Sequence, residues 1–188
     1  MKGVFLLERD EAVLYIVNLK IKEMVKEERE SVLLDWWTVD ETVTEYSSLP
    51  RLLQDELTYY EAPRKDVMNV FYDPLIRIAL QRDFIGVKNE YLSKCISIIS
   101  GDVQKVYGIQ ESLFKCPCCQ YRTIASKGEY EICKVCFWED DGNSYPNVYS
   151  SVNRMTLEQG QKKFSEIGIV DEKYRKHVEY NRFDKYSE

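Results

Sequence analysis

Two closely spaced pairs of cysteines constrain this chain more than any other feature. They lie in Cys116-Pro117-Cys118-Cys119 and Cys133-Lys134-Val135-Cys136. Two residues separate the members of each pair, as is usual for the thiolates of one tetrahedral structural zinc ion. Such a pair can face one ion when the backbone turns tightly, and the 13-residue gap leaves room for a tight β-hairpin between the pairs. We predict structural Zn²⁺ bound by Cys116, Cys119, Cys133 and Cys136.

Cys118 makes the first pair ambiguous. It lies between Cys116 and Cys119, so either Cys116/Cys119 or Cys116/Cys118 supplies the ligands, and the two-residue spacing favours Cys119. Cys118 is then either a spare thiol that oxidants can reach or a small buried residue, and we expect the latter. Pro117 stiffens the turn by fixing φ. Gln120 follows the pair where glycine would allow a positive φ, so we expect a less relaxed turn.

Composition and charge limit the classes of protein to consider. The chain has 188 residues, enough for one or two domains, and 44% apolar content is typical of globular proteins. Its net charge of −6 argues against a nucleic-acid binder and against an anionic membrane surface as partner, and it favours a basic partner.

Location can also be predicted from the sequence. The chain contains no uninterrupted run of 18 apolar residues, so no transmembrane helix is predicted. Met1–Asp10 lacks the features of a signal peptide. We therefore expect a cytoplasmic, reducing location, which suits zinc thiolates better than disulfides.

The first two helices are predicted within a helical domain that spans residues 1–110. The first is indicated by an apolar stripe at helical spacing: Leu14, Val17, Ile21, Met24 and Val25. Glu27–Ser31 is predicted to be a polar break or turn. A short second helix then starts at Ser31 or at the preceding acidic residues and runs through Val32–Leu34 to Trp36-Trp37.

Three further helices are predicted in the same domain. One begins near Ser48-Leu49-Pro50, and its expected buried face is Leu49, Leu52, Leu53 and Leu57. Another begins where Asp73 caps the helix and Pro74 takes its first position, and Gly86 separates it from the next. The last stops before Gly101 and carries Leu92, Cys95, Ile96 and Ile99 on one apolar face. Cys95 is therefore expected in the core rather than at a metal.

Residues 111–188 are predicted to form a small zinc-ribbon-like β module with a C-terminal helix, so the whole chain is α+β. Alternating side chains predict short strands near Val103–Tyr107, Tyr121–Ala125 and Tyr130–Ile132, with a hairpin tip at Lys127-Gly128. A helix is expected from Asn153 to Phe164, and the tail from Asp171 is expected to be a short helix with a frayed end. A module of about 75 residues has too small a core to fold readily alone, so the zinc is expected to hold it.

The residues around both cysteine pairs resemble the cysteine-rich CPCC family. The resemblance rests on Cys116–Cys119, on the Cys133–Gly142 block Cys-Lys-Val-Cys-Phe-Trp-Glu-Asp-Asp-Gly, and on the later Asn153, Leu157 and Phe164. It covers Phe114 to Gly168. It implies a small bacterial domain with a cysteine knuckle and a following helix. Gln120 departs from the glycine usual in the family, which affects the local turn.

The N-terminal half resembles helical segments of bacterial proteins encoded beside polymorphic toxins. The similarity lies in Glu28–Trp37 and in Leu49-Pro50-x-x-Leu53. This resemblance implies an immunity protein: a cytosolic protein that binds one toxin domain and neutralises it by direct contact.

Two other functions stay open. Glu139, Asp140 and Asp141 lie next to the cysteines and could bind a catalytic metal or act as general acid and base. A zinc ion with four thiolates has no open position, so we expect an acidic turn and no enzyme. His177 is the single histidine, and we expect no small-molecule substrate. The alternative is a nucleic-acid-binding regulator, for which basic residues lie around the ribbon: Lys105, Lys115, Arg122, Lys127 and Lys134.

Tryptophans and acidic side chains are the candidate interface residues. Trp36 and Trp37 point about 100° apart on a helix, so one can be buried while the other anchors a partner. We favour the alternative, in which both rings seal the join between the helices and the zinc module. Trp138 is expected to pack over the zinc turn. Glu139, Asp140 and Asp141 are further candidates, and ordinary solvated surface is expected of the other acidic residues, among them Asp10, Glu11, Glu27, Glu28, Glu30, Asp40, Glu41 and Glu45.

Overall fold

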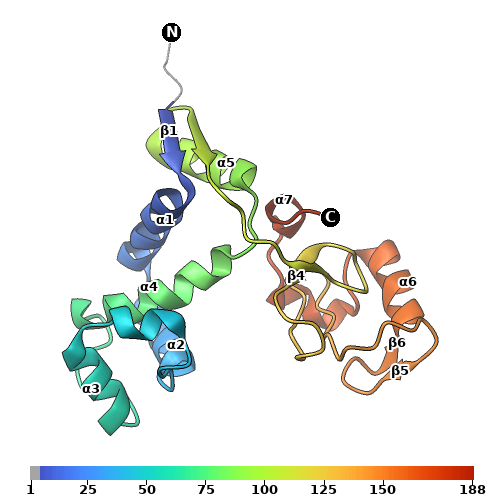
Figure 1. Cartoon of the computed structure of the whole chain (residues 1–188), viewed down its shortest axis with the longest axis horizontal. Coiled ribbons are helices and arrows are strands. Elements are labelled where there is room, and N and C mark those ends of the chain that lie inside the picture. Colours follow the sequence, from blue (N-terminus) through green and yellow to red (C-terminus); the bar gives the residue numbers. More distant parts are fainter. Residues whose placement is uncertain (1–4) are drawn as a thin grey trace. The chain divides into compact units, whose positions relative to one another are not determined.

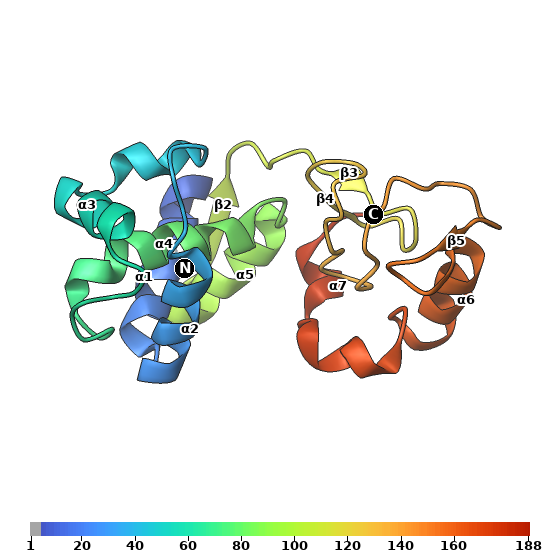
Figure 2. The same cartoon turned by 90° about the horizontal axis from the view of Figure 1, so that it is seen from below.

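A computed structural model describes residues 5–188 and confirms the α+β class, with helices in the N-terminal part and short strand pairs in the C-terminal part (Figures 1 and 2). The chain forms two compact units. The first contains the described residues as far as Ile85 together with Cys95–Val106, and the second contains Gly86–Lys94 and Tyr107–Glu188. Within residues 5–188, no helix has both the length and the apolar character needed to cross a bilayer.

Helices and one strand pair build the first unit. In chain order its elements are β1 (Phe5–Glu8), α1 (Arg9–Glu23), α2 (Lys26–Trp36), η1 (Thr44–Ser48), α3 (Arg51–Tyr59), η2 (Val70–Tyr72), α4 (Asp73–Gln81), η3 (Arg82–Phe84), the second half of α5 (Asn89–Ser100), and β2 (Gln104–Tyr107) as far as Val106. Strand β1 pairs with β2, and α4 packs against both α1 and α2.

The buried face of α1 differs in part from the predicted stripe. Val17 and Ile21 are buried as expected, but Leu14 and Val25 are exposed. The helix begins at Arg9, and its core face runs through Ala12, Val13, Ile16, Val17 and Ile21. Leu14 follows the buried Val13 directly, so it points about 100° away from that face.

The predicted break at Glu27–Ser31 is wrong, because these residues lie inside α2. The chain instead breaks at Met24 and Val25. The side chain of Glu28 accepts a hydrogen bond from the backbone N–H of Val25 (3.0 Å), which satisfies one donor at the helix start. The helix dipole also stabilises acidic residues in the first turn of a helix. The polar run therefore starts a helix rather than ending one.

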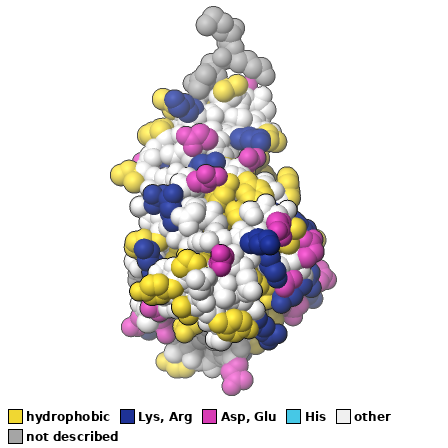
Figure 3. Space-filling model, turned by 90° about the vertical axis from the view of Figure 1, so that its right-hand side faces the viewer, with side chains coloured by type: hydrophobic (Ala, Val, Ile, Leu, Met, Phe, Trp, Pro, Cys, Tyr) yellow, Lys and Arg dark blue, Asp and Glu magenta, His cyan; other side chains and the backbone are white. Residues whose placement is uncertain are grey.

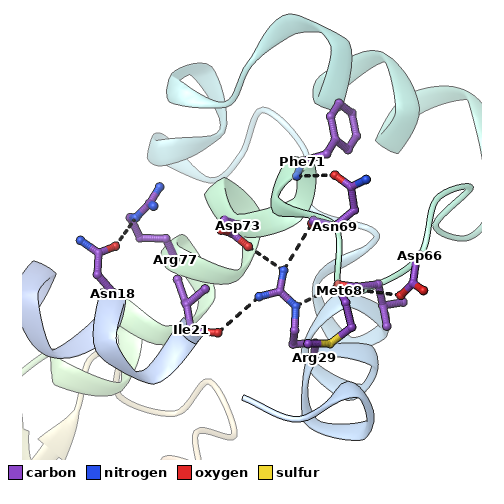
Figure 4. Close-up of polar contacts among 10 residues, drawn as sticks. Asn18, Ile21, Arg29, Asp66, Met68, Asn69, Phe71, Asp73 and Arg77 are labelled. Carbon is purple, nitrogen blue, oxygen red and sulfur yellow. Dashed lines mark hydrogen bonds and ion pairs between the residues drawn. The ribbon is translucent and has the colours of Figure 1, made fainter. Parts of the chain in front are cut away.

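Arg29 ties α2 to three other segments of the first unit (Figure 4). Its side chain is buried, and its guanidinium donates to the carboxylate of Asp73 at 2.6 Å, at the start of α4. It also donates to the backbone carbonyls of Val67 (2.9 Å), Asn69 (3.4 Å) and Ile21 (3.5 Å). One buried cation therefore satisfies carbonyls from α1 and from the loop before α4.

Helix α3 buries fewer leucines than predicted. Leu49 and Leu53 are buried and Leu57 is half-buried, but Leu52 is 73% exposed. The second buried residue of α3 is Glu56, three positions after Leu53 on the same face. Its carboxylate accepts a hydrogen bond of 2.6 Å from the buried hydroxyl of Tyr72.

Helix α4 begins one residue earlier than predicted. Tyr72 is its N-cap residue, Asp73 is its first residue and Pro74 its second, so Asp73 does not cap the helix. The carboxylate of Asp73 pairs with Arg29 instead. The apolar residues expected to follow are largely buried: Leu75, Ile76, Ile78 and Ala79.

The second unit combines short strand pairs with short helices. It contains the first half of α5, β3 (Phe114–Lys115), β4 (Arg122–Ile124), β5 (Tyr149–Ser150), β6 (Met155–Thr156), α6 (Leu157–Ile167), η4 (Glu172–His177) and α7 (Arg182–Lys185). Strands β3 and β4 are antiparallel, with Phe114 opposite Ile124, and β5 pairs with β6 in the same sense.

The predicted hairpin between the two cysteine pairs is wrong. Each pair instead lies within its own strand pairing: β3 and β4 flank the first, and an isolated bridge between Ile132 and Glu139 flanks the second. Lys127 and Gly128 form a turn between these two pairings rather than the tip of a hairpin. Each cysteine turn closes its own short ladder, so the connection between them need not be a strand pair.

Helix α6 starts later than predicted. It begins at Leu157 rather than Asn153, because Thr156 and Gln159 form a capping box. The Thr156 hydroxyl accepts from the backbone N–H of Gln159 (3.2 Å), and the Gln159 side chain accepts from that of Thr156 (2.9 Å). Gly168, with φ of 74°, ends the helix.

The C-terminal tail is packed, so the predicted frayed end is wrong. Tyr186, Arg182 and Lys185 are each at most 5% exposed. The guanidinium of Arg182 donates to the backbone carbonyls of Val135 (2.8 Å) and Gly168 (3.1 Å). The tail therefore holds both the second cysteine turn and the end of α6.

Candidate metal centre

Four cysteine sulfurs meet at one buried point of the second unit. The Sγ atoms of Cys116, Cys119, Cys133 and Cys136 all lie within 4.8 Å of one another. The pair Cys116 and Cys136 is 3.6 Å apart, and the pair Cys119 and Cys133 is 3.5 Å apart. None of the four side chains is more than 6% exposed. The structure thus brings together the four residues that the spacing selects.

The sulfur separations fit a bound metal ion and do not fit disulfides. All four cysteines are free, whereas the sulfurs of a disulfide lie about 2.05 Å apart. Thiolates about 2.3 Å from a tetrahedral zinc ion lie roughly 3.8 Å from each other, close to the separations found here. Four sulfur donors in this arrangement are close enough to hold one metal ion.

The two cysteine turns have the same backbone shape. In the first, the N–H of Gln120 donates to the carbonyl of Cys116 (2.9 Å), and in the second the N–H of Phe137 donates to that of Cys133 (2.9 Å). The last residue of each turn has a positive φ, 65° at Gln120 and 67° at Phe137. The expected unrelaxed turn at Gln120 is present, and the sequence interpretation missed the same feature at Phe137.

Three donors point at the sulfur of Cys133. They are the backbone N–H groups of Val135 (3.4 Å) and Cys136 (3.5 Å) and the hydroxyl of Thr123 (3.0 Å). Burial opposes ionisation of Cys133, but hydrogen bonds from the other three thiols and from Thr123 outweigh it and hold its pKa well below the usual value. The site therefore favours a thiolate at Cys133, the form that binds metal.

The neighbouring thiols are shifted the other way. Burial raises the pKa of Cys136 well above its usual value, and hydrogen bonds to the other thiols act in the same direction. Hydrogen bonds with Cys116 and Cys133 raise the pKa of Cys119. Several thiolates cannot coexist here without a neutralising charge, and a divalent cation would supply one.

Cys118 lies outside the four-sulfur cluster, which contains Cys119 instead. Its side chain is 4% exposed and lies beside α6, where a β-carbon added to Gly160 would come within 3.5 Å of the Cys118 sulfur. Cys118 is thus a small buried residue, as expected.

Comparison with known proteins agrees with this geometry. Residues 114–184 match the family model described as Cysteine-rich CPCC. The match contains both cysteine turns and extends through α6 and η4 into α7. No curated protein and no solved structure matches the chain. The CPCC segment, residues 114–184, is therefore a cysteine-rich domain whose four clustered thiols can bind metal.

Trp138 packs beside the second turn of the CPCC segment, as expected. It is fully buried, and its backbone carbonyl accepts from the N–H of Cys133 (2.8 Å). A β-carbon at Gly160 would lie 2.6 Å from the Trp138 ring, so α6 approaches the indole at a position that only glycine allows. The indole nitrogen is buried and has no hydrogen-bond partner among the described residues.

The acidic run of the CPCC segment is largely occupied with backbone contacts. Asp140 is only 4% exposed, and its carboxylate accepts from the N–H groups of Gly128 (3.0 Å) and Gly142 (3.4 Å). The side chain of Asp140 therefore faces inward, and a role for it in partner contact stays a prediction. Glu139 and Asp141 are half-buried. A buried carboxylate needs hydrogen-bond donors, and the backbone N–H groups of this acidic turn supply them to Asp140.

Asn153 was expected in a helix and has a different role. Its side chain accepts from the N–H of Glu139 (2.9 Å) and donates to the carbonyl of Glu139 (2.8 Å), as a neighbouring strand would. It also donates to the hydroxyl of Ser150 (2.8 Å). The sequence gives only the residue type of Asn153 and its separation along the chain from the cysteines, and neither predicts this contact.

The two adjacent tryptophans lie in the first unit and differ in exposure. Trp37 is buried, donates through its indole N–H to the carbonyl of Tyr60 (2.7 Å) and packs edge-on against Tyr72. Trp36 is half-buried, and the guanidinium of Arg82 lies 5.4 Å from its ring centroid. Of the two rings, Trp36 is the one that a partner could reach.

Proposed function

We propose that this protein is a non-enzymatic binding protein whose second unit is held by a structural Zn²⁺ ion, and that it neutralises a bacterial toxin domain by direct protein–protein contact. The observation that carries the structural part is the closed cluster of four buried cysteine sulfurs. Four thiolates complete the tetrahedral shell that zinc prefers, which leaves no position for a substrate or an attacking water.

The surroundings of the cluster support a structural role rather than a catalytic one. The buried carboxylate nearest in sequence, Asp140, is bound to backbone N–H groups. His177 is exposed, and its ring centroid lies 5.6 Å from that of Phe137. We propose that the metal supplies folding energy to a unit with a small core, as structural zinc does elsewhere.

The charge distribution supports a basic protein as the partner. The sequence of the first unit contains 12 lysines and arginines against 18 aspartates and glutamates, whereas the second contains 14 of each. The whole surplus of six negative charges thus belongs to the first unit. On the face drawn in Figure 3, basic side chains lie among acidic ones. This balance does not favour nucleic acid as a ligand, because such proteins carry a basic patch.

The toxin is proposed on the resemblance of Glu28–Trp37 and Leu49–Leu53 to proteins encoded beside polymorphic toxins. Immunity proteins of this kind need a soluble surface complementary to the toxin and no chemistry of their own. The acidic first unit offers such a surface to a basic toxin domain. We propose the cytoplasm as the site of action, where thiolates stay reduced.

Two measurements test the proposal. The purified protein should contain one zinc per chain by elemental analysis, and chelation should release it. Affinity capture of the tagged protein from its host, followed by mass spectrometry, should recover a toxin or its C-terminal fragment, and co-expression should restore growth of cells that produce that fragment.

Other outcomes would overturn each part separately. Iron or no metal in protein purified without added zinc would contradict structural zinc. Recovery of nucleic acid that is lost as salt is raised would favour the alternative, a nucleic-acid-binding regulator. Failure of the captured protein to inhibit growth would contradict the immunity role.

A further inference from the structure

A pocket in the acidic first unit lies where α2 ends and the chain turns toward η1. Its volume is about 300 Å³. The residues that line it are Asp35, Trp36, Thr38, Val39, Asp40, Thr42 and Val43. The walls therefore combine an aromatic ring with two negative charges, and none of the lining residues is basic.

The chain itself shows what the Trp36 ring accepts. The guanidinium of Arg82 lies 5.4 Å from the centroid of this ring and forms an ion pair with Glu45 at 3.2 Å. One arginine thus already combines an indole face with a carboxylate in this region. Arginine is suited to both contacts, because its planar guanidinium stacks on aromatic rings and pairs with carboxylates.

The sequence around the pocket is depleted of positive charge. Between Arg29 and Arg51 there is no lysine or arginine, whereas this stretch contains five acidic residues: Glu30, Asp35, Asp40, Glu41 and Glu45. The local field is therefore negative and is balanced only by residues from elsewhere, such as Arg82. A positively charged group is the ligand that such a pocket attracts.

One carboxylate among the residues that line the pocket is hydrogen-bonded within its own loop. The carboxylate of Asp40 accepts hydrogen bonds from the N–H of Thr42 (2.9 Å) and from its hydroxyl (2.6 Å). Asp40 remains exposed, so its other acceptor positions face solvent. A carboxylate held in this way loses less freedom when it binds.

We infer that this pocket receives an arginine side chain of a basic protein partner, with its guanidinium between the Trp36 ring and the carboxylates of Asp35 and Asp40. The inference rests on the proposed role in protein binding and adds the contact surface and the chemistry of its ligand. Asp35 and Asp40 are exposed and Trp36 is half-buried, and arginine is enriched among the residues that contribute most to interfaces.

The test uses the full-length protein and N-acetyl-arginine amide as the probe, followed by NMR. The probe should shift the Trp36 indole N–H and the backbone signals of residues 35–43 in a saturable manner. N-acetyl-citrulline amide, which has the same shape without the charge, should leave them unchanged. Asp35→Asn should weaken binding of the probe about threefold, and Trp36→Leu should weaken it more.

Glu30→Gln is the matched control, since Glu30 is an exposed carboxylate of the same helix that does not line the pocket. It should bind the probe as the parent protein does. The inference is overturned if no signal saturates, if citrulline shifts the same signals, or if Glu30→Gln weakens binding as much as Asp35→Asn. Because this test needs no toxin, its failure leaves the immunity proposal standing, and failure to capture a toxin leaves this result unchanged.

Discussion

At the scale of single residues, the cysteine cluster depends on positions that differ in what they contribute. The sulfur of Cys133 accepts two backbone N–H groups and a hydroxyl, so it is the thiol best prepared to lose its proton. Cys95 lies on α5 outside the cluster. Substitution of these two thiols should therefore have different effects.

We expect Cys133→Ser to lose the bound metal and to unfold the second unit, because three thiolates leave one coordination position to water and a hydroxyl is a poor zinc ligand. Elemental analysis and a thermal melt followed by tryptophan fluorescence would measure both effects. Cys95→Ser should keep the metal and most of the melting transition. Full metal content in Cys133→Ser would show that the four-thiolate site is wrong.

Gly160 is the second residue with an individual role. An alanine there would bring its β-carbon to 2.6 Å from the buried Trp138 ring. Although glycine to alanine within a helix usually stabilises by about 0.5–1 kcal/mol, we expect Gly160→Ala to destabilise by about 1–3 kcal/mol through overpacking. Denaturant unfolding would measure the change, and Ser165→Ala on the exposed side of α6 should stay within about 0.5 kcal/mol. Equal stability of both variants would contradict the close approach.

At the scale of elements, the buried side chain of Arg29 joins several segments of the first unit. Arg29 bonds to Asp73 and to three carbonyls, and its side chain is 4% exposed. Asn18 and Arg77 add a second link between α1 and α4, at 3.0 Å (Figure 4). Removal of the Arg29 guanidinium would take the paired cation from the Asp73 carboxylate and one donor from each of the three carbonyls.

We expect Arg29→Met to lower the free energy of unfolding by about 2–4 kcal/mol, since methionine fills similar space without replacing the hydrogen bonds. Chemical denaturation followed by circular dichroism measures this. Arg51→Met is the matched control, because Arg51 pairs with Asp55 on the exposed surface of α3 and should change stability by less than about 1 kcal/mol. Equal losses of unfolding free energy in Arg29→Met and Arg51→Met would show that the buried contacts of Arg29 add no stability.

The elements show which parts of the fold can be predicted from sequence. The cysteine spacing identified the residues of the cluster, and Gly101 marked the end of α5, since both signals are local. The Glu27–Ser31 run was misjudged because its polarity suggested a loop, whereas charged residues also form exposed helical turns. The contacts of Asn153 and Arg182 join segments distant in sequence, and no local pattern reports them.

At the scale of the whole molecule, the compact units do not follow the order of the chain. The second unit takes Gly86–Lys94 from before the last part of the first. Within it, the N–H of Lys88 donates to the carbonyl of Lys185 (2.8 Å), and the side chain of Asn181 donates to the hydroxyl of Tyr91. The cysteine-rich fold thus uses residues outside the segment that the family match covers.

A fragment of residues 86–188 should therefore fold with zinc more stably than one of residues 111–188. The shorter fragment lacks both contacts, and it exposes the groups that make them. Thermal melts of the two zinc-loaded fragments would compare them, and a difference in midpoint of several degrees is expected. Identical midpoints would show that Gly86–Lys94 contributes nothing to this fold.

The sharing of α5 between the two units also bears on how such a protein could be exchanged between genes. Recombination that joined a cysteine-rich segment to a new neighbour at the first cysteine pair would leave Gly86–Lys94 behind. A transferable segment has to include the beginning of α5. That stretch contains no cysteine, and its sequence is typical of the preceding helical domain. Relatives with a different N-terminal half are thus expected to keep a helix of this kind ahead of their cysteines.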